Sequence, residues 1–192
     1  MPKRTLTLVI ALVLVAAGLV FLALSTLQPQ LPLTNGSLSP TPIPYAHTML
    51  TMTPNPALST AGTNTQIAVM INSNGDKVSA AQLELAFDPT ALIVVDIAPA
   101  TTNPFFARTT QLLKVIDQRN GKVSYAVALG ASEKTKAGSG TLAIITVRLS
   151  PTAKTATLNF LPSTLVTATG VNPSVLVKAT GTTITLSTPT TQ

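Results

Sequence analysis

The stretch AAQLELAFDPTALIVVDI, residues 80–97, decides the fold of this chain. Apolar and polar residues alternate in its first half, and the apolar face takes Ala81, Leu83, Leu85 and Phe87. This alternation predicts a β-strand that is buried on one side. Asp88 and Pro89 then suit the first two positions of a type I turn, because Asp favours position i and the proline ring fixes φ at i+1. The second half is apolar on both faces, which predicts a strand covered on both sides.

Similar short patterns recur along the rest of the chain, and no helical periodicity separates them. They occupy residues 65–72, 112–117, 122–129, 141–149, 155–161 and 175–186. Turns are indicated at Asn120-Gly121 and at 138–140. Many short strands without helices between them predict an all-β, antiparallel β-sandwich.

The N-terminus predicts the location of the protein. Lys3 and Arg4 precede residues 5–27, which carry no charge. As a helix this run would be about 35 Å long, enough to cross a bilayer. The cations before it predict a cytoplasmic N-terminus and an extracytoplasmic remainder. A cleaved signal peptide, with secretion, is the alternative, since Ala23 and Ser25 are small residues at suitable offsets.

The following residues contain many prolines and predict an extended spacer, in which the single histidine, His47, is incidental. We therefore divide the chain into an anchor (1–27), a spacer rich in Pro, Ser and Thr (28–48), a β-sandwich domain (49–188) and a short tail (189–192).

The residue inventory argues against an enzyme. The chain has no cysteine and one histidine, so a serine hydrolase would lack its base. The acidic residues are scattered over different strands and turns: Asp76, Glu84, Asp88, Asp96, Asp117 and Glu133. Asp76 and Asp117 stand beside asparagines, where Asx turns account for them and a structural calcium is the alternative. We expect no cofactor and no metal.

The segment AFDPTALIVVDI resembles the strand, Asp-Pro turn and strand of cohesin domains. In order along the chain, AGTNTQIAV, NGKVSYAVAL, GSGTLAIITVRL and the Gly181–Leu186 strand are also similar to that family. The resemblance covers residues 49–187. It implies a jelly roll of about nine strands that binds dockerin modules, which fold around calcium, and that performs no catalysis.

The resemblance also implies where a partner docks. Type I cohesins use the sheet that contains the strand before the Asp-Pro turn, commonly through an outward Asn-x-Asp pair. Aligned on Asp88, that pair falls at Ala80 and Gln82, so the usual acceptors are absent.

Alternation predicts the outward face of this sheet. If the strands that begin at 80, 122 and 141 are neighbours, as in the family, they form a partner-binding patch of small and aliphatic side chains with Lys122 at its rim. The patch comprises Ala80, Gln82, Glu84, Ala86, Ser124, Ala126, Ala128, Leu142, Ile144 and Arg148. An ordinary sheet surface, or one covered by the spacer, is the alternative.

Carbohydrate binding is the second functional hypothesis, in polysaccharide degradation or cell-surface adhesion. Such modules stack sugars on aromatic rings, and this chain has no tryptophan. Alternation would force one ring of the pair Phe105 and Phe106 outward, which makes the pair the candidate glycan contact.

The net charge of +6 is spread along the chain and includes Lys3 and Arg4. We expect no nucleic-acid partner outside the membrane. The predicted partners are an extracellular protein, the membrane through the N-terminal helix and, as the alternative, a polysaccharide.

Overall fold

The computed structural model describes residues 46–54, 57–60, 62–171 and 173–187. The predicted anchor, most of the spacer and the predicted tail lie outside these residues. All described residues belong to the second of two compact units, Pro42–Gln192. Within them, no helix has the length and hydrophobicity needed to cross a membrane.

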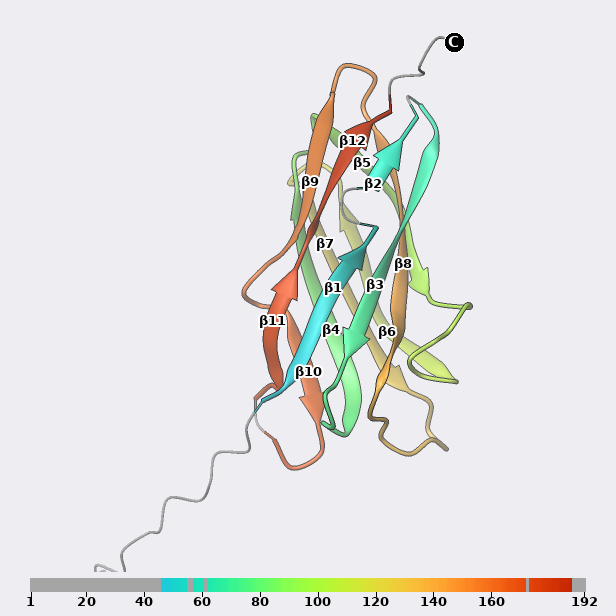
Figure 1. The fold of residues 1–192 in the computed structure, drawn as a ribbon, viewed down its shortest axis with the longest axis vertical. Coiled ribbons are helices and arrows are strands. Elements are labelled where there is room, and N and C mark those ends of the chain that lie inside the picture. Colours follow the sequence, from blue (N-terminus) through green and yellow to red (C-terminus); the bar gives the residue numbers. More distant parts are fainter. Residues whose placement is uncertain (1–45, 55–56, 61, 172, 188–192) are drawn as a thin grey trace, which may run out of the picture. The chain divides into compact units, whose positions relative to one another are not determined.

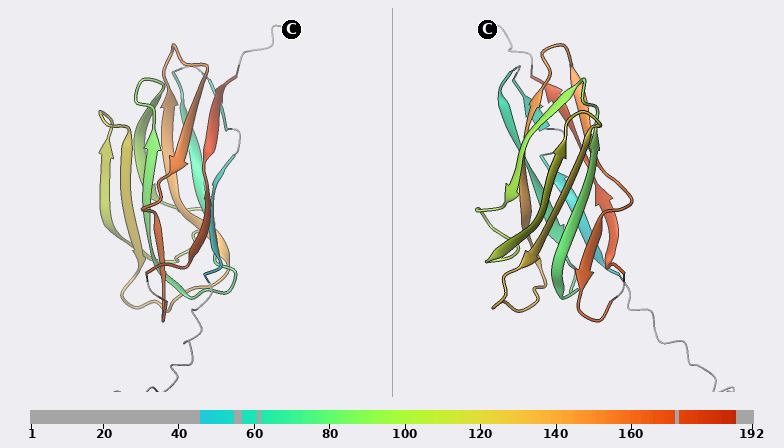
Figure 2. Two further views of the ribbon diagram at one scale, coloured as in Figure 1. Left: turned by 90° about the vertical axis from the view of Figure 1, so that its left-hand side faces the viewer. Right: turned by 180° about the vertical axis from the view of Figure 1, so that it is seen from behind.

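The described unit is a sandwich of two β-sheets (Figure 1). The five-stranded sheet has the order β11-β1-β3-β8-β5, and the seven-stranded sheet has the order β2-β12-β9-β4-β7-β6, with β10 also paired to β4. Figure 1 shows the five-stranded sheet in front, and the right-hand view of Figure 2 shows β4, β7 and β6 from behind. The strands are β1 Thr48–Thr53, β2 Ala57–Ser59, β3 Asn64–Asn72, β4 Val78–Phe87, β5 Leu92–Pro99, β6 Thr109–Asp117, β7 Lys122–Leu129, β8 Ser139–Leu149, β9 Thr155–Phe160, β10 Leu165–Ala168, β11 Leu176–Thr180 and β12 Thr182–Leu186.

The all-β sandwich is confirmed, but it has twelve described strands rather than about nine. The first and last strands are each divided, because the chain crosses between the sheets. β1 and β11 lie in the five-stranded sheet, whereas β2 and β12 lie in the other. Gly181 marks the second crossing, where an added Cβ would lie 2.3 Å from the carbonyl oxygen of Leu158. The pairs β1–β11 and β2–β12 are parallel, so the sandwich is not wholly antiparallel.

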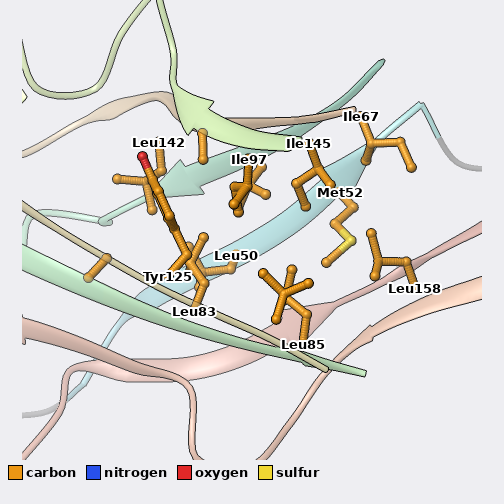
Figure 3. Close-up of a cluster of buried hydrophobic side chains, with 14 of the residues drawn as sticks. Leu50, Met52, Ile67, Leu83, Leu85, Ile97, Tyr125, Leu142, Ile145 and Leu158 are labelled. Atoms are coloured by element: carbon orange, nitrogen blue, oxygen red, sulfur yellow. The ribbon is translucent and has the colours of Figure 1, made fainter. Parts of the chain in front are cut away.

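The core lies between the two sheets and follows the predicted alternation. The predicted inward residues of β4 are all buried, as are Ile67, Val69 and Ile71 of β3. Figure 3 shows Leu83, Leu85 and Tyr125 from one sheet facing Ile97, Ile145 and Ile67 from the other. Burial raises the pKa of Tyr125 to about 12, and the charge of Asp96 adds to this effect.

The Asp-Pro turn between β4 and β5 is confirmed. The carbonyl oxygen of Asp88 accepts a hydrogen bond from the amide of Ala91 at 3.1 Å, which closes the turn. The Asp88 carboxylate accepts hydrogen bonds from the amide and hydroxyl of Thr90. These bonds hold the pKa of Asp88 below its usual value, because they stabilise the charged form.

Against this turn lies the Asn120-Gly121 turn, which joins β6 and β7. Gly121 has φ +63°, and its carbonyl oxygen accepts a hydrogen bond from the amide of Phe87 at 2.9 Å. The side chain of Asp117 accepts two hydrogen bonds from Asn120, so Asx chemistry accounts for this aspartate. The hydrogen bond between Phe87 and Gly121 connects the two turns.

The prediction that residues 92–97 are covered on both faces is wrong. β5 is an edge strand, and a β-bulge interrupts its pairing with β8 between Val94 and Asp96. Val95 is the extra residue and is 44% exposed, whereas Ile97 turns into the core. A continuous apolar run can therefore arise at a bulge, where one extra residue shifts the inward-facing positions of the strand by one.

Candidate functional site

The outward face of the seven-stranded sheet has small side chains along its two central strands. β4 and β7 pair in register, so Ala80 lies opposite Ala128, and Gln82 lies opposite Ala126. One step further, Glu84 lies opposite Ser124 and Ala86 opposite Lys122. The intervening residues of both strands are buried in the core, so these pairs point outward. The seven predicted site residues on β4 and β7 therefore lie side by side.

Larger aliphatic side chains flank these strands. On β6, Leu113 pairs with Ala126 and Val115 pairs with Ser124, so both residues point to the same face. On the other side of β4, Leu165 of β10 pairs with Gln82. These flanking side chains are 39%, 49% and 36% exposed, respectively. We call the outward residues of β4 and β7 together with Leu113, Val115 and Leu165 the docking face.

A hollow of about 430 Å³ adjoins the docking face beyond Leu165. Pro162 and Thr164 line it on one side, and Val177 and Lys178 of β11 line it on the other. The surface beyond Leu165 is therefore a hollow of mixed polar and apolar character.

A polar cluster occupies the middle of the docking face. The Nε2 amide of Gln82 donates a hydrogen bond to Oε1 of Glu84 at 2.8 Å, and the hydroxyl of Ser124 donates one to Oε2 at 2.6 Å. Thr164 fixes the backbone of Glu84 through hydrogen bonds to both its amide and its carbonyl oxygen. The carboxylate is therefore held at a defined position in the middle of the face, and Lys122 is the other charged residue, at the end of β7.

The prediction that the strand from 141 neighbours the strands from 80 and 122 is wrong. β8 lies in the five-stranded sheet, between β3 and β5, so Ile144 and Arg148 are on the opposite face of the sandwich. Ile144 is half-buried there, and Arg148 is exposed. The predicted patch is therefore divided between two faces that one small partner cannot cover together.

Leu142 is buried, although alternation predicted that it points outward. Met70 pairs with Thr141 and Val69 with Ala143, which leaves Leu142 as the extra residue of a bulge in β8. The bulge lets two successive side chains, Leu142 and Ala143, enter the core. Figure 3 shows Leu142 beside the hydroxyl end of Tyr125.

Phe105 and Phe106 do not form a glycan platform. Both rings are buried, with exposures of 0% and 3%, and they meet edge to face with centroids 5.0 Å apart. The segment is not a regular strand, so alternation does not apply to it. The amide of Phe105 bonds to the carbonyl oxygen of Thr141, which draws the pair against β8. The candidate glycan-contact pair is thus part of the core.

The prediction that His47 is an incidental spacer residue is wrong, because it belongs to the folded unit. Its amide donates to the Asp76 carboxylate at 3.0 Å, and Thr48 donates to the same group at 2.8 Å. Burial raises the pKa of Asp76, but these hydrogen bonds outweigh it, so the pKa lies below its usual value. Asp76 therefore fastens the start of β1 to the loop between β3 and β4.

The part of the chain that the structure describes contains no cluster of three or more metal-ligating His, Asp or Glu side chains. In this part of the chain Lys114 forms an ion pair with Asp96, and His47 Nδ1 lies 3.3 Å from Asp76 Oδ1. Neither contact involves a residue of the docking face.

Sequence reasoning missed the three flanking residues. Leu113 and Val115 were placed on a predicted strand, but the bulge at Leu112 disturbs the alternation that would have assigned their face. Leu165 lies on β10, a four-residue strand too short to predict from periodicity. The weak signal for β6 is a run of four large apolar residues, two on each side of Lys114.

A family model described as Cohesin domain matches residues 51–186. No curated protein matches the chain significantly. Among solved structures, the sixth cohesin of Acetivibrio cellulolyticus scaffoldin B, in complex with a Cel5 dockerin mutant, has a TM-score of 0.58 and 14% identity. That match covers 73% of this chain and 99% of the other.

Two further solved structures have the same fold. A type I cohesin–dockerin complex of Clostridium thermocellum, Coh-OlpC with Doc435, has a TM-score of 0.58 and 15% identity and covers 74% of this chain and 96% of the other. The non-cellulosomal cohesin of Archaeoglobus fulgidus has a TM-score of 0.58 and 17% identity, with coverages of 74% and 93%.

Proposed function

Because the chain belongs to the cohesin domain family, we propose that it is a non-catalytic module that binds a protein partner through the docking face. The observation that carries this proposal is the position of the face. It lies on the sheet that contains β4, the strand before the Asp-Pro turn, which is the sheet that type I cohesins use.

The chemistry of the face supports protein docking. Its central strands carry four alanines, one serine, one glutamine and Glu84, with Lys122 at the end, so a partner backbone can approach closely over the alanines. Its flanks carry exposed aliphatic side chains, whose removal from water favours association. The absence of long charged side chains from the centre, apart from Glu84, is typical of the core of a protein interface.

The dimensions of the face favour a helical partner. The row Leu113, Ala126, Gln82 and Leu165 crosses four adjacent strands. Three spacings of about 4.8 Å separate its ends by about 14 Å. An α-helix with its side chains is about 10–12 Å wide and fits over the small residues between the two leucines.

We propose a dockerin module as the partner. The structurally similar cohesins of A. cellulolyticus and C. thermocellum were solved with dockerins. In this chain, however, Ala80 and Gln82 stand where type I cohesins carry the Asn-x-Asp pair, and the carboxylate of the face is two residues further along, at Glu84. We therefore expect a dockerin whose contact residues differ from those of a standard type I partner.

The direct test measures binding of the full-length protein to a panel of calcium-loaded dockerin modules by isothermal titration calorimetry. Ala126→Trp places a large ring over the centre of the face, and Leu113→Asp places a charge on its flank. We expect each change to weaken binding at least about tenfold, or about 1.4 kcal/mol.

Ile144→Lys is the matched control, because Ile144 lies on the opposite sheet. It should leave the affinity unchanged. If Ile144→Lys lost binding while Ala126→Trp retained it, the interface would lie on the five-stranded sheet, which would contradict the proposal. Binding of insoluble polysaccharide in place of every dockerin would contradict it as well.

We also propose that the module is held at the extracytoplasmic side of a membrane by residues 5–27. The support is the uncharged 23-residue length of this run, with Lys3 and Arg4 before it. The full-length protein should sediment with membranes and resist extraction with carbonate. A soluble protein that begins near Thr26 would instead indicate a cleaved signal peptide.

A further inference from the structure

The docking face contains one carboxylate that is held in place without a countercharge. Glu84 is half-buried, and its two oxygens accept hydrogen bonds from Gln82 and Ser124. Both donors are neutral, so they orient the carboxylate but leave its negative charge uncompensated. A carboxylate has about four acceptor sites, so sites remain available to a further donor.

Neither of the lysines on the neighbouring strands forms an ion pair with Glu84. Lys114 on β6 forms an ion pair with Asp96 of the other sheet. Lys122 stands at the end of the docking face, opposite Ala86 on one side and Asp117 on the other. No Lys or Arg of the described residues forms an ion pair with Glu84.

A partner that covers the face must remove Glu84 from water. Burial of an unpaired charge carries a large desolvation cost, whereas a cation delivered to the carboxylate offsets it. The surrounding alanines offer no compensation, because they have no polar side-chain atoms. Because no cation of the described residues forms an ion pair with Glu84, a positively charged side chain of the partner is the group that offsets this cost.

We propose that Glu84 is a specificity determinant that selects a dockerin helix carrying Lys or Arg at the centre of its contact surface. This inference rests on the proposed docking function. A partner with a neutral or acidic side chain at that point leaves Glu84 buried without a countercharge and is rejected. Gln82 and Ser124 act as positioning residues, because they fix the carboxylate before the partner arrives.

Glu84→Gln tests the proposal, since it removes the charge and keeps the size of the side chain. The probe is whichever calcium-loaded dockerin of the panel binds the wild-type protein, together with variants in which each Lys or Arg of its helices is replaced by Gln. We expect Glu84→Gln to weaken binding about 10- to 100-fold. One dockerin variant should lose binding to a similar extent, and combining it with Glu84→Gln should cause little further loss.

Glu133→Gln is the matched control, because Glu133 lies in the turn after Gly130 and outside the docking face. It makes the same change of charge and should leave the affinity within about twofold. A salt titration of the wild-type complex adds a measurement that needs no variant. Its affinity should fall as the salt concentration rises, because ion pairs are screened.

Two outcomes separate the inference from the function beneath it. A dockerin that binds through the docking face with equal affinity for wild type and Glu84→Gln overturns the inference and leaves the proposed function intact. A panel in which no dockerin binds overturns the proposed function, on which the inference rests. Coupling between Glu84 and one partner cation supports both.

Discussion

Ser124 on β7 donates its hydroxyl hydrogen to Glu84 on β4, with 2.6 Å between Ser124 Oγ and Glu84 Oε2. This bond joins the two central strands on the outward face. Ser124→Ala should lower the free energy of unfolding by about 1–2 kcal/mol, because a hydrogen bond to a charged group is lost. Urea denaturation measures the change.

Ser79→Ala is the control, since the Ser79 hydroxyl makes an exposed 3.3 Å bond to the carbonyl oxygen of Thr167. This change should cost less than about 0.5 kcal/mol. Equal losses in the two variants would show that the Glu84 contact contributes nothing beyond an exposed hydrogen bond.

Replacing leucine with alanine should affect different properties on the two faces of the seven-stranded sheet: stability on the buried face and partner binding on the docking face. Leu85 is fully buried, so Leu85→Ala should destabilise the protein by about 2–5 kcal/mol through lost burial and a cavity. Leu113 is 39% exposed on the docking face, so Leu113→Ala should cost less than about 1 kcal/mol and should instead weaken partner binding. Thermal unfolding and calorimetry distinguish the two effects. A larger loss of stability in Leu113→Ala would invert the assignment of the faces.

Gly121 should resist replacement far more strongly than Gly75. Both have positive φ, but a Cβ at Gly121 would lie 2.1 Å from the carbonyl oxygen of Phe87, whereas one at Gly75 meets nothing within 4 Å. Gly75→Ala should therefore cost about 1 kcal/mol from backbone strain alone. Gly121→Ala should cost several kcal/mol more, read from midpoints of urea denaturation. Similar midpoints would mean that the two turns are not tied together as described.

The contact between Lys114 and Asp96 should make stability depend on pH. The hydrogen bond from Lys114 holds the pKa of Asp96 below its usual value, although burial opposes this effect. The pKa of Asp96 is lower in the folded state than in the unfolded state, where it is about 3.9. The stabilisation is therefore complete above the unfolded-state pKa and is lost as the pH falls through the folded-state pKa.

Lys114→Met should therefore reduce the loss of stability between pH 5 and the folded-state pKa of Asp96. Urea denaturation across that pH range measures the change. Part of the dependence should remain, because Asp76, Asp88 and Asp117 also have lowered pKa values. An unchanged pH profile in Lys114→Met would show that this ion pair does not couple the edges of the two sheets.

Sequence alternation predicted burial well where strands are regular. It placed Leu83, Leu85 and Phe87 inside, and it placed Ala80, Gln82 and Glu84 on the outward face of the same strand. The two-residue repeat of a β-strand determines which face a side chain occupies, because successive Cβ atoms point to opposite sides of the sheet. For this reason the central part of the docking face could be predicted.

The same period says nothing about which strands are neighbours, so β8 was assigned to the wrong sheet. It also fails at bulges, where one extra residue reverses the pattern, as at Val95, Leu112 and Leu142. Outside strands it has no meaning, and Phe105 and Phe106 were misplaced for that reason. The flanks of the docking face therefore required the three-dimensional pairing.

The most direct test of the account is amide hydrogen exchange of the full-length protein with and without a bound, calcium-loaded dockerin. If the docking face is the interface, the additional protection should be concentrated in β4, β6 and β7, around Gln82, Leu113 and Ala126. The opposite sheet, around Met70 and Ile144, should exchange as in the free protein. Protection confined to β3 and β8 would contradict the account.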